Sequence, residues 1–167
     1  NIVKKFEGNY KNDEKNGKGI EYDFNYNGTK IVKKFEGYYK NDKKYGKGKQ
    51  YASDGISIIF EGEFIDDKKN GKGMEYDLEN YNKKFEGEYK NGERNGKGIE
   101  YDIKNNKIFE GEYKNGKRNG KGISYDNNKN IIYECEYING QKTGKEKVKE
   151  YYKKKLRFEG ECINFIK

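Results

Sequence analysis

A pattern of 17 residues recurs along the chain and constrains its fold more than any other feature. It is clearest from Phe109 to Tyr125, and a nearly identical copy runs from Phe85 to Tyr101. Seven copies begin at Phe6, Phe35, Phe60, Phe85, Phe109, Tyr133 and, in shortened form, Phe158. After a longer first interval, successive starts are about 25 residues apart, a period typical of a repeat array.

Several positions of the repeat hardly vary when positions are counted from its opening aromatic residue. Position 2 is Glu in all seven copies, position 12 is Gly in all six long copies, and positions 7 and 8 read Asn-Gly, Asn-Asp or Asp-Asp. The position 12 glycines are Gly17, Gly46, Gly71, Gly96, Gly120 and Gly144. Their recurrence predicts backbone conformations that other residues adopt only at a cost in free energy.

Each copy reads as a β-hairpin. The opening Phe-x-Gly-x-Tyr alternates with a period of two, and Asn-Gly or Asn-Asp tolerates the positive φ of a tight turn. A two-residue loop at positions 7 and 8 would place positions 15 and 17 on the same face as the glutamates. A five-residue loop over positions 7 to 11 instead pairs position 1 with 17 and position 3 with 15, which gathers the aromatic residues on one face. We favour the longer loop, with the second strand beginning near position 12, because an open antiparallel sheet needs one apolar and one solvated face.

The composition agrees with a sheet that has no globular core. Hydrophobic residues make up only 31% of the chain, but aromatic residues make up 16% and are regularly spaced. The absence of proline leaves every strand position able to donate a hydrogen bond. We expect an all-β protein, an elongated, twisted single-layer antiparallel sheet of about 12 to 14 strands formed by consecutive hairpins. One array fills residues 1–167, with residues 145–167 as a C-terminal cap in which Phe165 and Ile166 are available.

The repeated pattern Phe/Tyr-Glu-Gly-Glu-Tyr-x-Asn-Gly-x-x-x-Gly-x-Gly resembles the MORN (membrane occupation and recognition nexus) repeat, and the resemblance covers nearly the entire chain. It implies a long, twisted antiparallel sheet of stacked hairpins. Proteins similar to this act as scaffolds, form homodimers or hold partner segments along the aromatic face. Some MORN arrays accompany catalytic domains, and others work at membranes.

The sequence offers no chemistry that indicates an enzyme. Histidine is absent and the two cysteines occupy repeat positions, so neither a catalytic triad nor a zinc site is expected. Gly-Lys-Gly at positions 12 to 14 lacks the spacing of a phosphate-binding loop. We therefore expect no catalytic residues, no metal and no cofactor.

Basic residues recur at two positions. Position 13 is Lys in all six long copies, and position 10 is basic in each of them, as Lys15, Lys44, Lys69, Arg94, Arg118 and Lys142. Repetition places these basic side chains in a row along the loop edge of the sheet. This row either protects the edge and keeps the protein soluble, or it attracts anionic phospholipid or an acidic protein. Nucleic acid is a less suitable partner because the aromatic spacing fits sheet packing better than base stacking.

The expected apolar face supplies the functional hypothesis. A single-layer sheet leaves one face lined by rings, represented by Phe85, Tyr89, Tyr101, Phe109, Tyr113 and Tyr125. We expect a non-enzymatic scaffold whose aromatic face binds a protein partner or a second copy. The alternatives are peripheral binding to anionic phospholipid through the basic loops, or a regulatory array for a catalytic domain outside this chain. The expected location is intracellular and cytoplasmic, with membrane or cytoskeletal association as a further alternative.

Overall fold

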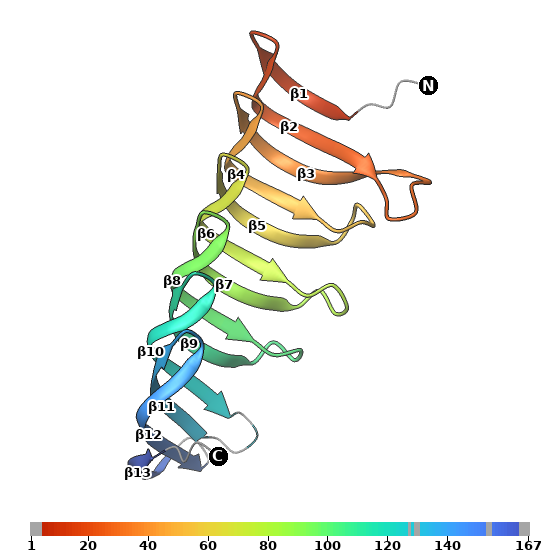
Figure 1. Ribbon diagram of the computed structural model, residues 1–167. Helices are drawn as coiled ribbons and strands as arrows, with labels where there is room; N and C mark the ends of the chain where they lie inside the picture. The colour runs from red at the N-terminus through yellow and green to blue at the C-terminus, as the bar shows by residue number, and fades with distance from the viewer. Residues whose placement is uncertain (1–4, 127, 129–130, 153–154, 164–167) are drawn as a thin grey trace. The chain divides into compact units, whose positions relative to one another are not determined.

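The computed structural model describes residues 5–126, 128, 131–152 and 155–163, and these residues form β-strands joined by turns and short connections (Figure 1). The strands are β1 (Phe6–Lys11), β2 (Glu14–Phe24), β3 (Ile31–Lys40), β4 (Lys43–Tyr51), β5 (Ile58–Ile65), β6 (Lys68–Tyr76), β7 (Lys83–Lys90), β8 (Glu93–Tyr101), β9 (Lys107–Lys114), β10 (Lys117–Asp126), β11 (Ile131–Ile138), β12 (Gln141–Tyr152) and β13 (Lys155–Ile163). The thirteen strands follow their sequence order in an antiparallel sheet. The predicted all-β hairpin architecture and its number of strands are confirmed.

The hairpin turns are shorter than expected. In the fifth repeat Lys114 pairs with Lys117, so only Asn115 and Gly116 form the loop, with φ of 50° and 76°. The equivalent pairs in the first three repeats also have positive φ at both residues, as in Asn12 (51°) and Asp13 (63°). Two successive residues with positive φ are the requirement of a type I′ turn, whose twist matches that of the flanking strands. The five-residue loop over positions 7 to 11 is therefore wrong, and the second strand begins at position 9.

An irregularity in the second strand of each hairpin accounts for the remaining residues. In the fifth repeat Tyr113 pairs with Arg118 and Gly111 pairs with Gly122, so three residues, 119–121, lie opposite Glu112 alone. The glycine at the centre of this β-bulge, Gly120, has a φ of 100°. The corresponding Gly17, Gly46, Gly71 and Gly96 also have positive φ, which confirms the prediction for position 12 in five copies. Gly144 falls outside the residues whose surroundings are described.

The bulge changes the register that the sequence suggested. Position 3 pairs with 14 and position 1 with 16, as in Gly111 with Gly122 and Phe109 with Ser124. The expected pairs of position 1 with 17 and of position 3 with 15 are wrong. Each hairpin consequently has two mixed faces. We call the side with positions 1, 5, 10, 14 and 16 the Phe face, and the side with positions 2, 4, 13, 15 and 17 the Glu face.

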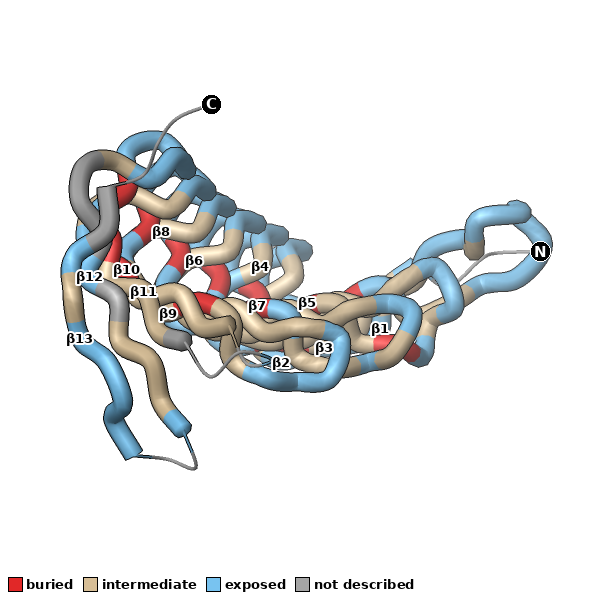
Figure 2. Tube along the Cα trace, turned by 90° about the horizontal axis from the view of Figure 1, so that it is seen from below, coloured by how far each residue is buried: buried red, intermediate tan, exposed pale blue. Residues whose placement is uncertain are grey.

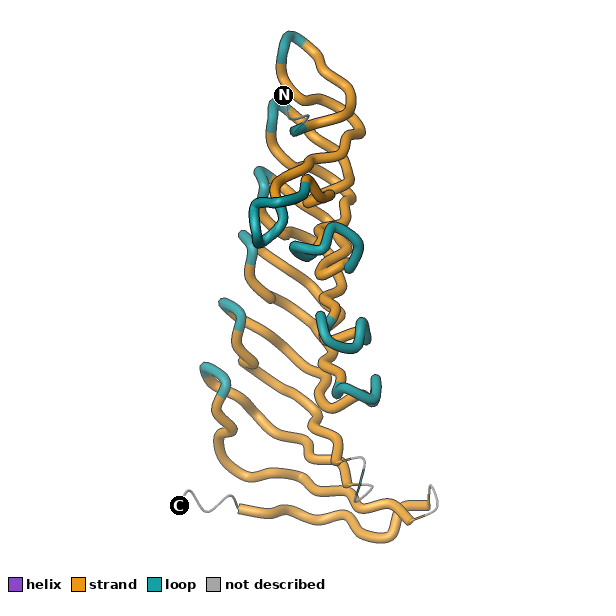
Figure 3. Tube along the Cα trace, turned by 90° about the vertical axis from the view of Figure 1, so that its right-hand side faces the viewer, coloured by secondary structure: helices purple, strands orange, loops and turns teal. Residues whose placement is uncertain are grey.

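The chain forms two compact units by its internal contacts, residues 1–83 with 89–92 and residues 84–88 with 93–167. Within each unit, consecutive hairpins join at their turns. The Asp42 N–H donates to the Lys15 carbonyl at 3.1 Å in the first unit, and the Gly116 N–H donates to the Arg94 carbonyl at 2.9 Å in the second. Figure 3 shows these turns at one end of the strands and the longer connections at the other.

The C-terminal part of the second unit continues the same architecture. Strands β11 and β12 form a sixth hairpin with the type of loop seen earlier, and β12 also pairs with β13. The basic stretch from residue 145 to 157 is thus strand wherever it is described. Phe165 and Ile166, the residues expected to cap the array, lie outside the described residues.

Candidate functional site

The opening Phe of each repeat lies directly on two glycines. In the fifth repeat a Cβ atom added to Gly111 would come within 2.6 Å of the Phe109 ring and 2.7 Å of the Gly122 Cα. One added to Gly122 would come within 2.6 Å of the same ring. Any larger residue at position 3 or 14 would displace the ring, because Cβ atoms do not approach other carbon atoms so closely. These two positions are therefore glycine to let the aromatic ring lie on the backbone.

The ring at position 5 of each repeat covers the opening rings around it. Tyr113 meets Phe85 and Phe109 edge-on, with ring centroids 5.1 and 5.7 Å apart, and the Tyr39 ring meets Phe6 and Phe35 in the same way. Edge-to-face pairs of this kind are favourable beyond the apolar area that they bury. As a result Phe35, Phe60, Phe85 and Phe109 have no exposed surface, although no second layer covers the described strands. Figure 2 shows these buried segments in red.

The basic residue at position 10 lies over the opening aromatic ring of its own repeat on the Phe face. The Arg118 guanidinium carbon lies 4.0 Å from the Phe109 ring centroid, and Arg94 has the same distance to Phe85. The lysines at this position lie over the opening ring of their own repeat at 4.3 to 5.1 Å, in the pairs Lys15–Phe6, Lys44–Phe35, Lys69–Phe60 and Lys142–Tyr133. These distances are those of cation–π contacts. The position 10 side chains therefore recur from repeat to repeat beside the turns, but in the first five repeats they pack over aromatic rings instead of extending freely into solvent.

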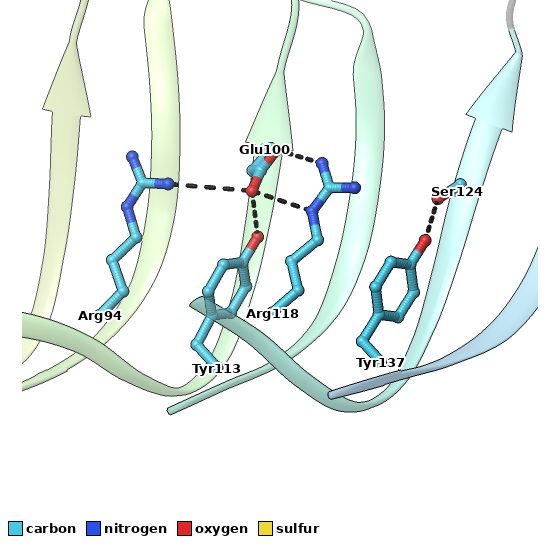
Figure 4. Close-up of polar contacts among 6 residues, drawn as sticks. All are labelled: Arg94, Glu100, Tyr113, Arg118, Ser124 and Tyr137. Carbon is cyan, nitrogen blue, oxygen red and sulfur yellow. Dashed lines mark hydrogen bonds and ion pairs between the residues drawn. The ribbon is translucent and has the colours of Figure 1, made fainter. Parts of the chain in front are cut away.

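Glu100 at position 16 joins the ring of one repeat to the cations of two (Figure 4). It accepts hydrogen bonds from the Tyr113 hydroxyl at 2.6 Å and from Arg118 Nε at 3.2 Å, and its Oε1 lies 3.8 Å from Arg94. Burial acts to raise the pKa of Glu100, but the hydrogen bonds and charges of these partners outweigh it and lower the pKa. Burial and the hydrogen bond to Glu100 raise the pKa of Tyr113.

The same arrangement recurs with changes that preserve hydrogen bonding. Glu21 accepts from the Tyr39 hydroxyl at 3.2 Å and pairs with Lys44 at 3.1 Å, and Ser124 bonds the Tyr137 hydroxyl at 2.7 Å. Where position 5 is Phe64, which has no hydroxyl group, the opposing position 16 is the neutral Gln50. The hydroxyl groups of Tyr39, Tyr113 and Tyr137 thus find hydrogen-bond partners within the Phe face.

The structure divides the six predicted aromatic site residues between the two faces. Phe85, Phe109, Tyr89 and Tyr113 lie on the Phe face with at most 4% of their surface exposed. Tyr101 and Tyr125, at position 17, lie on the Glu face and are half-buried. The expectation of one exposed face that carries all six rings is wrong, because the two-residue turn and the bulge place positions 15 and 17 opposite the glutamates.

On the Glu face, ordered polar groups surround the position 17 rings. The Tyr125 hydroxyl donates to Glu110 at 3.3 Å, and Glu110 pairs with Lys107 at 2.7 Å. The hydrogen bond and the charge of Lys107 lower the pKa of Glu110. Tyr51 makes the corresponding hydrogen bond to Glu36 at 3.1 Å. Glutamate at position 2 therefore orients a tyrosine whose ring remains partly open to solvent.

Among the basic residues exposed in the first five repeats are those at position 13, in the bulge. They are Lys18, Lys47, Lys72, Lys97 and Lys121. The sequence contained the signal for this difference, since a glycine on each side of Lys, within a strand, indicates a bulge that turns the intervening residue outward. In the first five repeats the residue at position 13 is therefore more exposed to solvent than the residue at position 10.

The described residues contain neither a metal site nor a membrane-spanning helix. No cluster of His, Cys, Asp and Glu in them could hold a metal ion. Among the same residues there is no helix with the length and apolar character needed to cross a membrane.

Comparison with known proteins identifies the repeat. The family model described as MORN repeat matches residues 6–28, 35–57, 60–77, 85–107 and 109–131, which together make up more than half of the chain. A search of curated proteins gave no match. The matched segments begin at the opening aromatic residues of the first five hairpins, and β11 and β12 add a sixth hairpin of the same design. The chain therefore belongs to the MORN-repeat family.

Proposed function

We propose that the protein is a non-enzymatic repeat scaffold that binds a protein partner through its Glu face. A MORN array is a repeat module of a kind that often takes part in protein or membrane interactions, and the family is generally non-catalytic. From the second to the fifth repeat, the rings of the Phe face have little surface left to offer, because neighbouring repeats and the position 10 cations already cover them. The Glu face is the surface that remains.

One observation carries this proposal. Half-buried apolar and aromatic side chains recur on the Glu face from repeat to repeat, and no second layer covers them in the described part of the chain. They are Ile20, Tyr22, Tyr51, Met74, Tyr76, Ile99, Tyr101, Ile123 and Tyr125. Tyrosine suits a contact surface of this kind because its ring provides contact area and its hydroxyl tolerates water.

The charges favour a protein partner over an anionic bilayer. Glutamate at position 2 lies on the Glu face in every hairpin, beside the lysine at position 13, and this mixture of charges attracts an anionic membrane surface less than a purely basic face would. The position 10 cations, which were the expected lipid contacts, are held against rings and, as in Lys44 with Glu21, against carboxylates of the Phe face. A protein can place basic and apolar groups opposite such a mixed surface.

The test compares two pairs of substitutions that remove tyrosines. Tyr101→Ser with Tyr125→Ser alters only the Glu face and should abolish the capture of protein partners from a lysate of the source cell while the circular dichroism spectrum is retained. Light scattering on the purified protein shows whether a second copy is the partner. Tyr89→Ser with Tyr113→Ser removes buried rings, so it should lower thermal stability. If the Glu-face variant captured the same proteins in the same amounts, the proposal would fail.

A further inference from the structure

The second repeat departs from the other copies at positions that packing does not require to change. Tyr38 replaces the Glu found at position 4 in the third to sixth repeats, and Tyr45 replaces the Asn found at position 11 in four others. Lys49 replaces the Ile or Met found at position 15 in the first, third, fourth and fifth repeats. Tyr38 and Tyr45 are 51% and 44% exposed. Residues that break a local rule without a structural gain indicate a function.

The change at position 4 removes a useful acceptor. In the fourth repeat the Glu88 carboxylate lies beside the bulge glycine Gly96 and accepts a hydrogen bond from the Lys97 N–H at 3.3 Å. In the second repeat Tyr38 has no carboxylate with which to do this, and only its Cβ lies near the glycine, 3.8 Å from where a Cβ of Gly46 would be. The tyrosine ring therefore does not substitute for the carboxylate.

The other departures add a second aromatic group and more positive charge. The Lys40 ammonium group lies 5.2 Å from the Tyr45 ring centroid, next to the hairpin turn. Lys47, on the Glu face like Tyr38, is exposed at the bulge. Lys49 pairs with Glu61 at 3.5 Å, although both side chains keep about two-fifths of their surface exposed. Tyr38, Lys40, Tyr45, Lys47 and Lys49 form what we call the second-repeat patch.

The excess of positive charge in this hairpin is not shared by the hairpins on either side. Residues 35–51 contain five lysines and two acidic residues, whereas residues 6–22 contain three and four, and residues 60–76 contain three and five. The two acidic side chains of the second hairpin already have partners within the protein. Glu36 pairs with Lys33 at 2.9 Å, and Asp42 accepts a hydrogen bond from the Lys15 N–H at 2.8 Å.

We infer that the second-repeat patch binds a short acidic segment of the partner protein. Carboxylates can pair with Lys40 and Lys47 and accept hydrogen bonds from the hydroxyls of Tyr38 and Tyr45. The small width of the patch favours a short acidic segment over a longer anionic partner. A long nucleic acid or a bilayer would extend over the acid-rich hairpins on either side, whereas a few acidic residues fit within one repeat. The inference rests on the proposed function, since it names the partner chemistry at one place on the Glu face.

The inference can be tested with a fluorescein-labelled tetraglutamate peptide, which spans up to roughly 14 Å when extended. Fluorescence anisotropy should show binding to the full chain that weakens as salt is raised. Tyr38→Glu, Tyr45→Asn and Lys49→Ile together restore residues that the fourth and fifth repeats already contain, so folding should be preserved. This variant should bind the peptide at least about tenfold more weakly.

A matched pair of single substitutions controls for overall charge. Lys47→Gln and Lys72→Gln remove the same charge at position 13 of neighbouring repeats. The first should weaken peptide binding several-fold, and the second should leave it within about twofold. In the opposite direction, Glu88→Tyr, Asn95→Tyr and Ile99→Lys transplant the patch into the fourth repeat and should add a second binding site per chain.

Three results would overturn the inference: no peptide binding, equal losses from Lys47→Gln and Lys72→Gln, or unchanged binding after restoration of the common residues. Tighter binding of a thymidine oligonucleotide or of phosphatidylserine vesicles, lost in the restored variant, would overturn it too, by assigning the patch to another anion. The capture experiment with Tyr101→Ser and Tyr125→Ser tests the scaffold function independently of peptide binding. If Tyr101→Ser with Tyr125→Ser abolishes capture but the peptide does not bind, the scaffold stands and the acidic partner is wrong.

Discussion

At the scale of single residues, the fold depends on glycines that serve two different needs. Those at positions 3 and 14 make room for a phenylalanine ring, as Gly111 and Gly122 do beneath Phe109. The glycine at position 12 supplies a positive φ within a strand, as Gly96 does at 102°. Because side chains impede the backbone at positive φ, the second need can be tested apart from the first.

Gly96→Val should lower the free energy of unfolding by at least about 1 kcal/mol, because valine is strained at positive φ and would collide with Glu88. Gly92→Asp is the control. It also changes a glycine with positive φ, but Asp13, Asp42 and Asp67 occupy the same turn position with φ of 63° to 66°. Urea denaturation should show a small change for Gly92→Asp. Equal effects of the two substitutions would contradict a special role for position 12.

Glu100 should contribute to stability in a way that depends on pH. Its pKa in the folded protein lies below the ordinary value of 4.5, so the ionised form is favoured by folding. This stabilisation is present above pH 4.5 and is lost as the pH falls through the folded-state pKa. Glu100→Gln should therefore be less stable than the wild type at pH 7, and the difference should shrink toward pH 3. Thermal melts across this range measure it, and a constant difference would exclude the ionised carboxylate as its source.

At the scale of the hairpin, the sequence predicted the elements better than their register. The period, the Asn-Gly turn signal and the alternation of Phe109, Gly111 and Tyr113 were sufficient to predict hairpins. The predicted strand register was wrong because it assumed that all aromatic rings lie on one face of the sheet. Tyr125 can instead remain half-buried on the Glu face, since its hydroxyl bonds to Glu110. The bulge around Gly120 breaks the alternation in a strand where simple periodicity predicts none.

The difference between positions 10 and 13 is testable in one hairpin. Arg118→Ala removes the cation over the Phe109 ring and a hydrogen-bond donor to Glu100, so it should destabilise the protein by about 1 to 3 kcal/mol. Lys121→Ala removes an exposed residue of the bulge and should change stability by less than about 0.5 kcal/mol. Chemical denaturation compares them. A larger loss of stability from Lys121→Ala than from Arg118→Ala would mean that position 13, and not position 10, contributes to packing.

At the scale of the whole molecule, stability should be approximately a sum over repeats and their neighbouring contacts. The ring of each repeat is buried by residues of its own and adjacent hairpins, as Phe109 is by Tyr113 and Tyr137. The binding surface was harder to predict from the repeated sequence than the fold. Repetition identifies the residues that packing uses, and only the exceptions to it, such as Tyr38 and Tyr45, point to a surface that binds.

Removing residues 131–167 deletes β11 to β13 and tests this additivity. The remaining five hairpins should retain a β-sheet circular dichroism spectrum and unfold at a lower urea concentration, with a smaller denaturant dependence because less surface is exposed on unfolding. Tyr113 and the hairpins before it should keep their stability because their neighbours are intact. Complete loss of structure would show that the chain folds as one indivisible unit.

The hydrogen bond from each turn to the position 10 carbonyl of the preceding hairpin has a consequence for how such a protein changes over generations. A gene segment that encodes one whole repeat can be duplicated or lost, and the hairpins on either side still find the donor and acceptor that they require. The length of the array is thus free to vary without redesign. A copy that packing already satisfies can then differ from its neighbours at exposed positions, as the second repeat does at Tyr38 and Tyr45.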